Sequence, residues 1–169
     1  MRVQFMHYCA LGGSSVNELS FGQDELHHGC TSLKLAISEQ VLALHEKGVS
    51  DFLTTAEYGF PLFAAEAVLA ARLLHPDNPP RLHVVMPHEG QAHRWSDSVR
   101  ERFYNIHEAA DSVTMLATQF TDECYLEADE FIMKRSVMLL TDGGNAELSK
   151  LARTKNKHIE RISTSARMT

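Results

Sequence analysis

The sequence predicts an α/β fold of three layers, with a doubly wound, mainly parallel sheet between two layers of helices. Two observations carry this prediction. Short apolar runs alternate along the chain with longer segments whose apolar residues recur every three or four positions. Glycine and proline clusters such as 76–80 separate them. Strands that alternate with helices require crossover connections, which give a parallel sheet.

Five apolar runs are the expected strands, at 3–11, 51–57, 81–87, 112–117 and 136–142. A sixth strand at an edge of the sheet is an option for 158–164. Following the doubly wound pattern, we expect the first strand in the centre and the order 3-2-1-4-5.

The segments between the strands are the expected helices. A stripe from Leu26 to Leu44 predicts a helix over 24–47, which Gly48 ends. Pro61 opens the second helix, since proline is favoured in the first turn. A third stripe runs from Trp95 to Ala110 and places Trp95 on that helix, over the crevice or packed on the core. The last two helices are expected over 123–135 and in the second half of 143–154.

Length and composition limit the class of protein. The 169 residues suit a single domain over 1–169, with a loose tail from about 164. The 22 acidic and 16 basic residues give a net charge of −6, which argues against a nucleic-acid surface. Three widely spaced cysteines favour a reducing cytoplasm over a disulfide framework, and no run is apolar enough to span a membrane.

Candidate binding residues follow the strands, because ligands of such sheets bind beyond the carboxyl ends of the strands. Gly12, Gly13 and Ser14 after the first strand allow close approach of a phosphate to the backbone, although a plain connecting loop is the alternative. Thr54, Thr55 and Gly59 precede a helix N-terminus that could attract an anion, or they form a capped turn.

The last strand is followed by Asp142, Gly143 and Gly144. Asp142 could bind a ribose hydroxyl, or it could cap the next helix or form a turn. His83, His88 and His93 are spaced by five, which matches neither a helix face nor a strand face, so we expect no metal.

The chain resembles the YpsA-like family of the SLOG superfamily, a Rossmann-like group that also includes DprA and the LOG lysine-decarboxylase-like proteins. The resemblance covers roughly residues 4–152. It rests on Cys9-Ala10, Gly13, Leu19, Phe21-Gly22, Asp24-Glu25, Leu33-Lys34, Gly48, Phe52, Gly59, Ala64-Ala65-Glu66, Pro87, Gln91, Trp95, Tyr104, Ala110-Asp111 and Asp142-Gly143. It implies a Rossmann-like domain with a ligand derived from a nucleotide, and it adds Gln91 and Trp95 to the candidate binding residues.

The chain departs from the family at its polar positions. Gly12-Gly13-Ser14-Ser15-Val16 replaces Thr-Gly-His-Arg-Pro, Gly59-Phe60-Pro61 loses the acid of Gly-x-Asp, and Ala128-Asp129 stands where the family has Arg-Asn. Losing an arginine from a phosphate site removes a positively charged guanidinium, which can donate two parallel hydrogen bonds to the phosphate. The chain therefore binds a different, less anionic ligand, or it has lost the ligand.

Three functions remain open. The first is binding of a nucleotide-derived or related small molecule, for which no cofactor can be named. The second is hydrolysis of a nucleotide N-glycosidic bond, with Glu66 or Asp142 as general base or electrostatic stabiliser. The third is a non-catalytic, dimeric scaffold that has kept only the fold. Gly13→Val is the substitution that the sequence suggests for blocking backbone access without disturbing the core.

Overall fold

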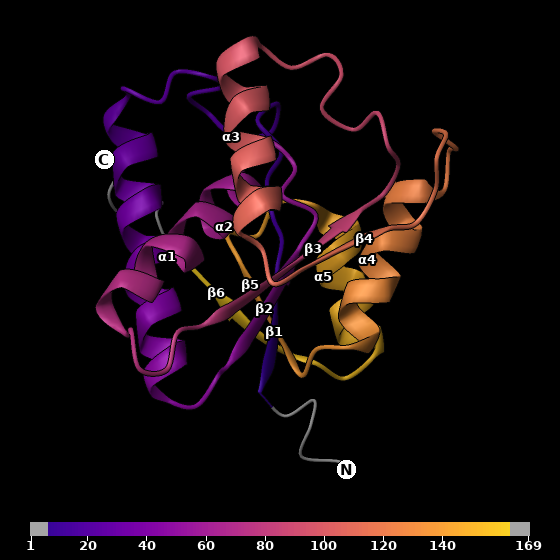
Figure 1. The fold of residues 1–169 in the computed structure, drawn as a ribbon. Helices are drawn as coiled ribbons and strands as arrows, with labels where there is room; N and C mark the ends of the chain where they lie inside the picture. The colour runs from indigo at the N-terminus through magenta and orange to yellow at the C-terminus, as the bar shows by residue number, and fades with distance from the viewer. Residues whose placement is uncertain (1–6, 163–169) are drawn as a thin grey trace.

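A computed structural model, which describes residues 7–162, confirms the α/β fold (Figure 1). Residues 7–162 contribute six parallel strands to one sheet, in the order β4-β3-β2-β1-β5-β6. The strands are β1 (Tyr8–Leu11), β2 (Asp51–Thr54), β3 (Arg81–Met86), β4 (Ser112–Met115), β5 (Met138–Thr141) and β6 (His158–Arg161). The helices are α1 (His28–Glu46), α2 (Phe60–Ala71), α3 (Asp97–Ala109), α4 (Cys124–Lys134) and α5 (Ala146–Thr154), with a 3₁₀ turn η2 (Arg72–Leu74) after α2.

The strand order differs from the expected 3-2-1-4-5. Strand β4 pairs with β3 at one edge, and β5 takes the place beside β1. The sixth strand, left open above, forms the opposite edge. Burial explains the exchange, because all four residues of β5 are buried whereas no residue of β4 is. A fully apolar strand is stabilised most in the interior of a sheet.

Local chemistry sets where the helices begin. The side chain of His27 accepts a hydrogen bond from the backbone N–H of Gly29, so α1 begins later than the expected residue 24. Pro61 lies in the first turn of α2, as expected. Ser96 caps α3 by accepting from Val99. Trp95 therefore precedes α3 instead of lying on it, and the expectation that placed it on the helix is wrong.

Two layers of helices cover the sheet. Helices α1, α2 and α3 lie on one face, and α4 and α5 lie on the other (Figure 1). The larger core is on the first face and includes Ile37, Val68 and Phe103, and the smaller core includes Ile132 and Leu148. The ring of Trp95 packs against this larger core, with its centroid 5.1 Å from that of Phe103.

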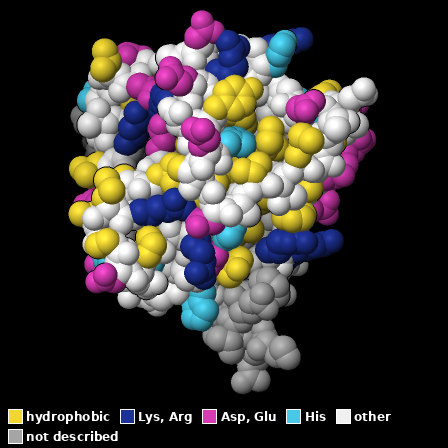
Figure 2. Space-filling view, viewed as in Figure 1, with side chains coloured by type: hydrophobic (Ala, Val, Ile, Leu, Met, Phe, Trp, Pro, Cys, Tyr) yellow, Lys and Arg dark blue, Asp and Glu magenta, His cyan; other side chains and the backbone are white. Residues whose placement is uncertain are grey.

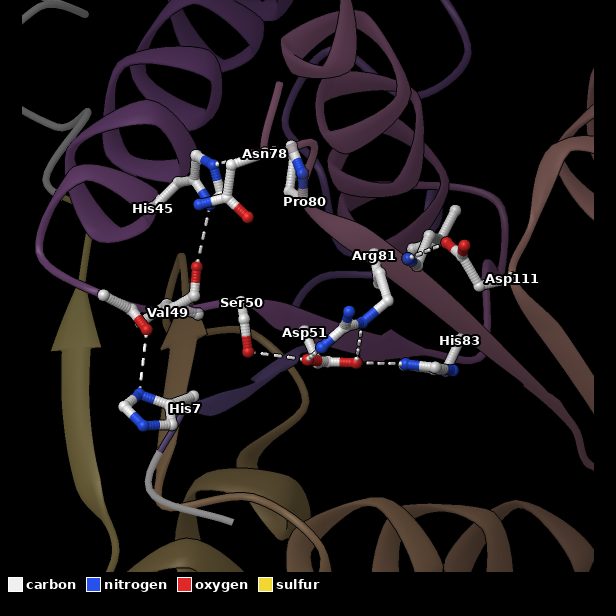
Figure 3. A network of polar contacts seen from close by, with 12 residues as sticks. His7, His45, Val49, Ser50, Asp51, Asn78, Pro80, Arg81, His83 and Asp111 are labelled. Atoms are coloured by element: carbon white, nitrogen blue, oxygen red, sulfur yellow. Dashed lines mark hydrogen bonds and ion pairs between the residues drawn. The ribbon is translucent and has the colours of Figure 1, made fainter. Parts of the chain in front are cut away.

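A polar network around the buried carboxylate of Asp51 joins the amino ends of β2 and β3 (Figure 3). Both carboxylate oxygens of Asp51 accept from the guanidinium of Arg81 at 3.0 Å, and His83 and Ser50 contact the same carboxylate at 2.6 Å. Nearby, the ring nitrogens of His45 lie 2.9 and 2.7 Å from backbone carbonyl oxygens. The polar groups at this end of the sheet are thus paired with one another, and the carboxyl ends of the strands remain the expected place for a candidate site.

The surface gives two further observations. On the face seen in Figure 2, basic side chains lie among acidic and apolar ones and form no continuous stripe. Among residues 7–162, none of the helices combines the length and the apolar character that crossing a bilayer needs. The expected start of the first strand at 3–6 and the expected tail from 164 lie outside the described residues.

Candidate functional site

A cavity of about 410 Å³ lies beyond the carboxyl ends of β1 and β2, on the face that α4 and α5 cover. The loops after β1, β2 and β5 form its rim together with the first residues of α4 and α5. Its walls are made by Ala10, Leu11, Gly12, Gly13, Ser15, Glu18, Thr55, Glu57, Pro61, Tyr125, Leu126, Asp129, Ile132, Asn145, Glu147 and Leu148. The position is the crevice at which doubly wound sheets bind their ligands.

Backbone hydrogen bonds hold the two main loops of the rim together. The N–H of Phe60 donates to the carbonyl of Ser14, and the N–H of Val16 donates to the carbonyl of Tyr58, each at 2.9 Å. Gly59 makes this approach possible: its φ is +130°, and a Cβ there would lie 2.4 Å from the Ser14 carbonyl oxygen. Much of the backbone in the expected anion-binding turns is thus occupied within the protein.

Asp142 holds the loop after β5 against the loop after β1. One of its carboxylate oxygens, Oδ1, accepts from the N–H groups of Ser14 at 2.9 Å and of Gly144 at 3.1 Å. A Cβ on Gly13 would lie 2.4 Å from that oxygen and 3.1 Å from the ring of Phe60. Gly13→Val therefore disturbs the packing of the protein without ligand, and the sequence-based expectation that it would spare the core is wrong.

The chemical character of the cavity is acidic. Four carboxylates line it, from Glu18, Glu57, Asp129 and Glu147, and none of the described residues in its walls is Lys or Arg. Burial raises the pKa of Glu57 to about 7, and the negative charges of Asp129 and Glu18 add to this rise. Burial also raises the pKa of Asp129 to about 6, against a hydrogen bond from Asn145 that lowers it.

The rest of the wall offers an aromatic ring and apolar surface. Tyr125 at the start of α4 lines the cavity, and burial raises the pKa of its hydroxyl further above neutral pH. Leu126, Ile132 and Leu148 supply apolar contacts. A flat ring could pack on this wall while its polar edge meets the carboxylates.

The structure brings some of the expected binding residues together at this cavity. Gly12, Gly13 and Thr55 are in its walls. The others at the strand ends lie behind the wall and support the loops. Thr54 is fully buried and accepts from the N–H of Ala56, while Gly144 packs on Ser14. A Cβ on Gly143 would meet the guanidinium of Arg161, and this places Gly143 against β6.

Other expected residues lie elsewhere. Glu66 points toward α3, where its two carboxylate oxygens accept from the guanidinium of Arg102 at 2.7 and 2.9 Å. Gln91 is buried and donates to the carbonyl of Thr55, which places it beneath the cavity wall, and its own Oε1 has no partner among the described residues. Trp95 packs against Tyr58 on the opposite face of the sheet.

Sequence reasoning missed the carboxylates that give the cavity its charge. Glu57 lies inside the turn 54–61 that the sequence singles out, and its position after a buried strand was the available signal. Asp129 was noticed only as a departure from the Arg-Asn pair of the family, and Tyr125 was not a candidate, because both come from α4 and reach the cavity only through the packing of that helix. No group of three or more His, Cys, Asp and Glu side chains within residues 7–162 has the arrangement of a metal site.

Comparison with known proteins gives one consistent result. The model of the YpsA family, described as a YspA SLOG family, matches residues 9–163. A UPF0398 protein of Halalkalibacterium halodurans is 36% identical over 108 residues, which are 64% of this chain and 56% of that protein. UPF0398 proteins of Bacillus cereus and Brevibacillus brevis are 27% and 26% identical, over 79% and 78% of this chain and 73% of each relative. The chain thus spans little more than half of the first relative.

Proposed function

The chain belongs to the YpsA family of SLOG proteins, and on that premise we propose that its cavity binds a nucleoside-like small molecule of low charge. The ligand has a flat ring that packs on Tyr125 and the apolar wall. Its hydroxyl or amino groups donate hydrogen bonds to the carboxylates of Glu57 and Asp129.

The charge of the cavity supports this proposal most directly. A phosphate brought next to four carboxylates is repelled, and here no cationic side chain in the described wall offsets that repulsion. Sugar hydroxyls and exocyclic amines are donors, and hydrogen bonds from a donor to an ionised carboxylate are stronger than neutral ones. The volume of about 410 Å³ is within the range of small-molecule pockets.

Thermal shift provides the test. The panel pairs adenosine, guanosine and cytidine with their 5′-monophosphates and adds ADP-ribose. A ligand at about 100 times its Kd stabilises the native state by ~2.7 kcal/mol, which for this size of domain raises the Tm by roughly 5–10 °C. We expect a nucleoside to give the larger shift of each pair. A larger shift with the monophosphates contradicts the proposal, and no shift with any member favours the scaffold function.

A matched variant locates the site. Above about pH 8 the carboxyl group of Glu57, with its pKa of about 7, is ionised. Glu57→Gln keeps the size of the side chain and removes this charge, so we expect the affinity for the nucleoside at that pH to fall about tenfold, the difference of ~1.4 kcal/mol between a charged and a neutral acceptor. Glu123→Gln, which removes an exposed carboxylate just before α4, serves as the control. Equal affinity in the two variants would place the ligand elsewhere.

A second candidate function is hydrolysis of an N-glycosidic bond. Glu57 favours it, because a carboxyl group with a pKa of about 7 in a cavity suits general acid–base catalysis. Glu57 is better placed for this role than Glu66, which is paired with Arg102, or Asp142, which holds two backbone amides. Chromatography for free base after incubation with each nucleoside tests this, with Glu57→Gln as the inactive variant.

A further inference from the structure

Glu18 makes an unusual pair of contacts at the rim of the cavity. Its Oε1 accepts from the backbone N–H of Ser15 at 3.0 Å, and its Oε2 accepts from the backbone N–H of Asn145 at 3.3 Å. Ser15 belongs to the loop after β1, and Asn145 is the N-cap of α5 in the loop after β5. One carboxylate therefore bridges two loops that are 130 residues apart.

Asp142 makes the corresponding bridge one residue back in each loop. It accepts from the N–H groups of Ser14 and Gly144, the residues that directly precede Ser15 and Asn145. Four backbone donors at this end of the sheet, two consecutive residues in each loop, are thus directed at two carboxylates. Clustered backbone N–H groups at a strand end and a helix N-terminus are the donors that bind anions in proteins.

The two carboxylates differ in how firmly they are held. The carboxylate of Asp142 is partly buried and packs against the position of Gly13, so the fold depends on it. Glu18 is exposed, and it lines the cavity. Removing its side chain frees the N–H groups of Ser15 and Asn145, and it removes one of the charges that raise the pKa of Glu57.

We propose that Glu18 determines the specificity of the cavity by occupying the position at which the phosphate of a ligand would bind. An anion from outside must displace a carboxylate that the chain itself holds at high effective concentration. The cavity accordingly selects the unphosphorylated form of a ligand over its phosphate ester. This selection rests on the proposed function, but the anion-binding capacity of the freed loops does not.

The experiment measures a gain of binding in Glu18→Ala. Isothermal titration with inorganic phosphate and with AMP is carried out on the wild type, on Glu18→Ala and on Glu147→Ala. Glu147 is the matched control, because it also lines the cavity and lies in the first turn of α5, while no backbone N–H of the described residues donates to its carboxylate. We expect Glu18→Ala to bind AMP at least tenfold more tightly than the wild type and Glu147→Ala to change less than threefold.

Two results overturn the proposal. An equal gain in both variants means that only the overall charge matters, and no gain in Glu18→Ala means that the freed amides bind no anion. If Glu18→Ala loses its cooperative melting transition, Glu18→Ser, which also removes the carboxylate from the position proposed for the phosphate, carries the same comparison. Adenosine titrated into the wild type tests the proposed function separately, so a failure there leaves the phosphate result interpretable.

Discussion

At the rim of the cavity, a residue whose sequence motif suggests ligand binding can instead stabilise the fold. The sequence left open whether Asp142 binds a ribose or forms a turn. In the structure its Oδ1 holds the N–H groups of Ser14 and Gly144, which is the structural alternative. The Asp-Gly pair predicted a turn correctly, but the partner in the loop after β1 is 128 residues away and no local pattern could reveal it.

Asp142→Ala tests this role by its effect on stability. The change leaves two backbone N–H groups without their acceptor, and each unsatisfied donor costs about 1–3 kcal/mol. Because the site is only partly buried, we expect a total loss of about 2–3 kcal/mol in urea unfolding. Asp142→Asn retains the acceptor oxygen and should lose less than half as much. Equal losses in the two variants would contradict the bridging role.

At the scale of elements, one arginine joins three segments on the larger helical layer. Arg102 of α3 donates to Glu66 of α2 at 2.7 and 2.9 Å and to Glu25, which precedes α1, at 2.7 Å. Lys34 and Tyr58 also donate to Glu25, at 2.6 and 2.9 Å. Burial alone would raise the pKa of Glu25, but these donors lower it to about 2.

Arg102→Leu should therefore loosen this layer. The substitution leaves Glu66 without its guanidinium partner and removes one of the donors to Glu25. Because all three side chains are partly exposed, we expect the free energy of unfolding to fall by about 1–3 kcal/mol. The carboxylate of Glu25 contributes stability above pH 4.5 that is lost as the pH falls toward 2. The difference between wild type and variant, measured by urea unfolding, should accordingly shrink between pH 5 and pH 3. A difference that is independent of pH contradicts the ionic origin.

For the whole molecule, the sequence predicted the class of the fold and the positions of most strands and helices. These follow from the spacing of apolar residues along short segments, which is a local property of the sequence. The sequence did not predict the order of the strands, which depends on which strands are apolar enough to lie in the interior of the sheet. The sequence MLLT of β5 is more apolar than SVTM of β4, and this difference could have placed β5 in the centre of the sheet and β4 at its edge. The cavity was predicted as a location at the strand ends, but its acidic character arises from α4 and the loops meeting in space.

The ionisable groups of the two ends of the sheet together predict the pH dependence of stability. Burial alone would raise the pKa of Asp51, but hydrogen bonds from Arg81, Ser50 and His83 lower it. The donors around Glu25 lower the pKa of Glu25 in the same way. Glu25 and Asp51 contribute stability that is lost as the pH falls below their ordinary pKa values of 4.5 and 3.8. Glu57 and Asp129 act in the opposite sense. Their raised pKa values mean that the native state keeps protons that the unfolded state has released, so stability falls as the pH rises from about 4.5 to about 7.

We therefore expect the Tm to be highest near pH 5 and to fall toward pH 7.5. The double variant Glu57→Gln/Asp129→Asn removes the two groups responsible for the fall. Because both side chains keep some exposure to solvent, we expect a gain of about 2 kcal/mol at pH 7.5, or roughly 4–8 °C in Tm. At pH 4.5 the same variant should match the wild type, since Glu57 and Asp129 are then protonated in the native wild type and are as uncharged as the amides that replace them. Calorimetric scans of the two proteins between pH 4.5 and 7.5, with Glu123→Gln as the control for an exposed carboxylate, measure the difference. Parallel curves for wild type and double variant would show that the cavity carboxylates are not the source of the pH dependence, and would also weaken the case for an acidic binding cavity.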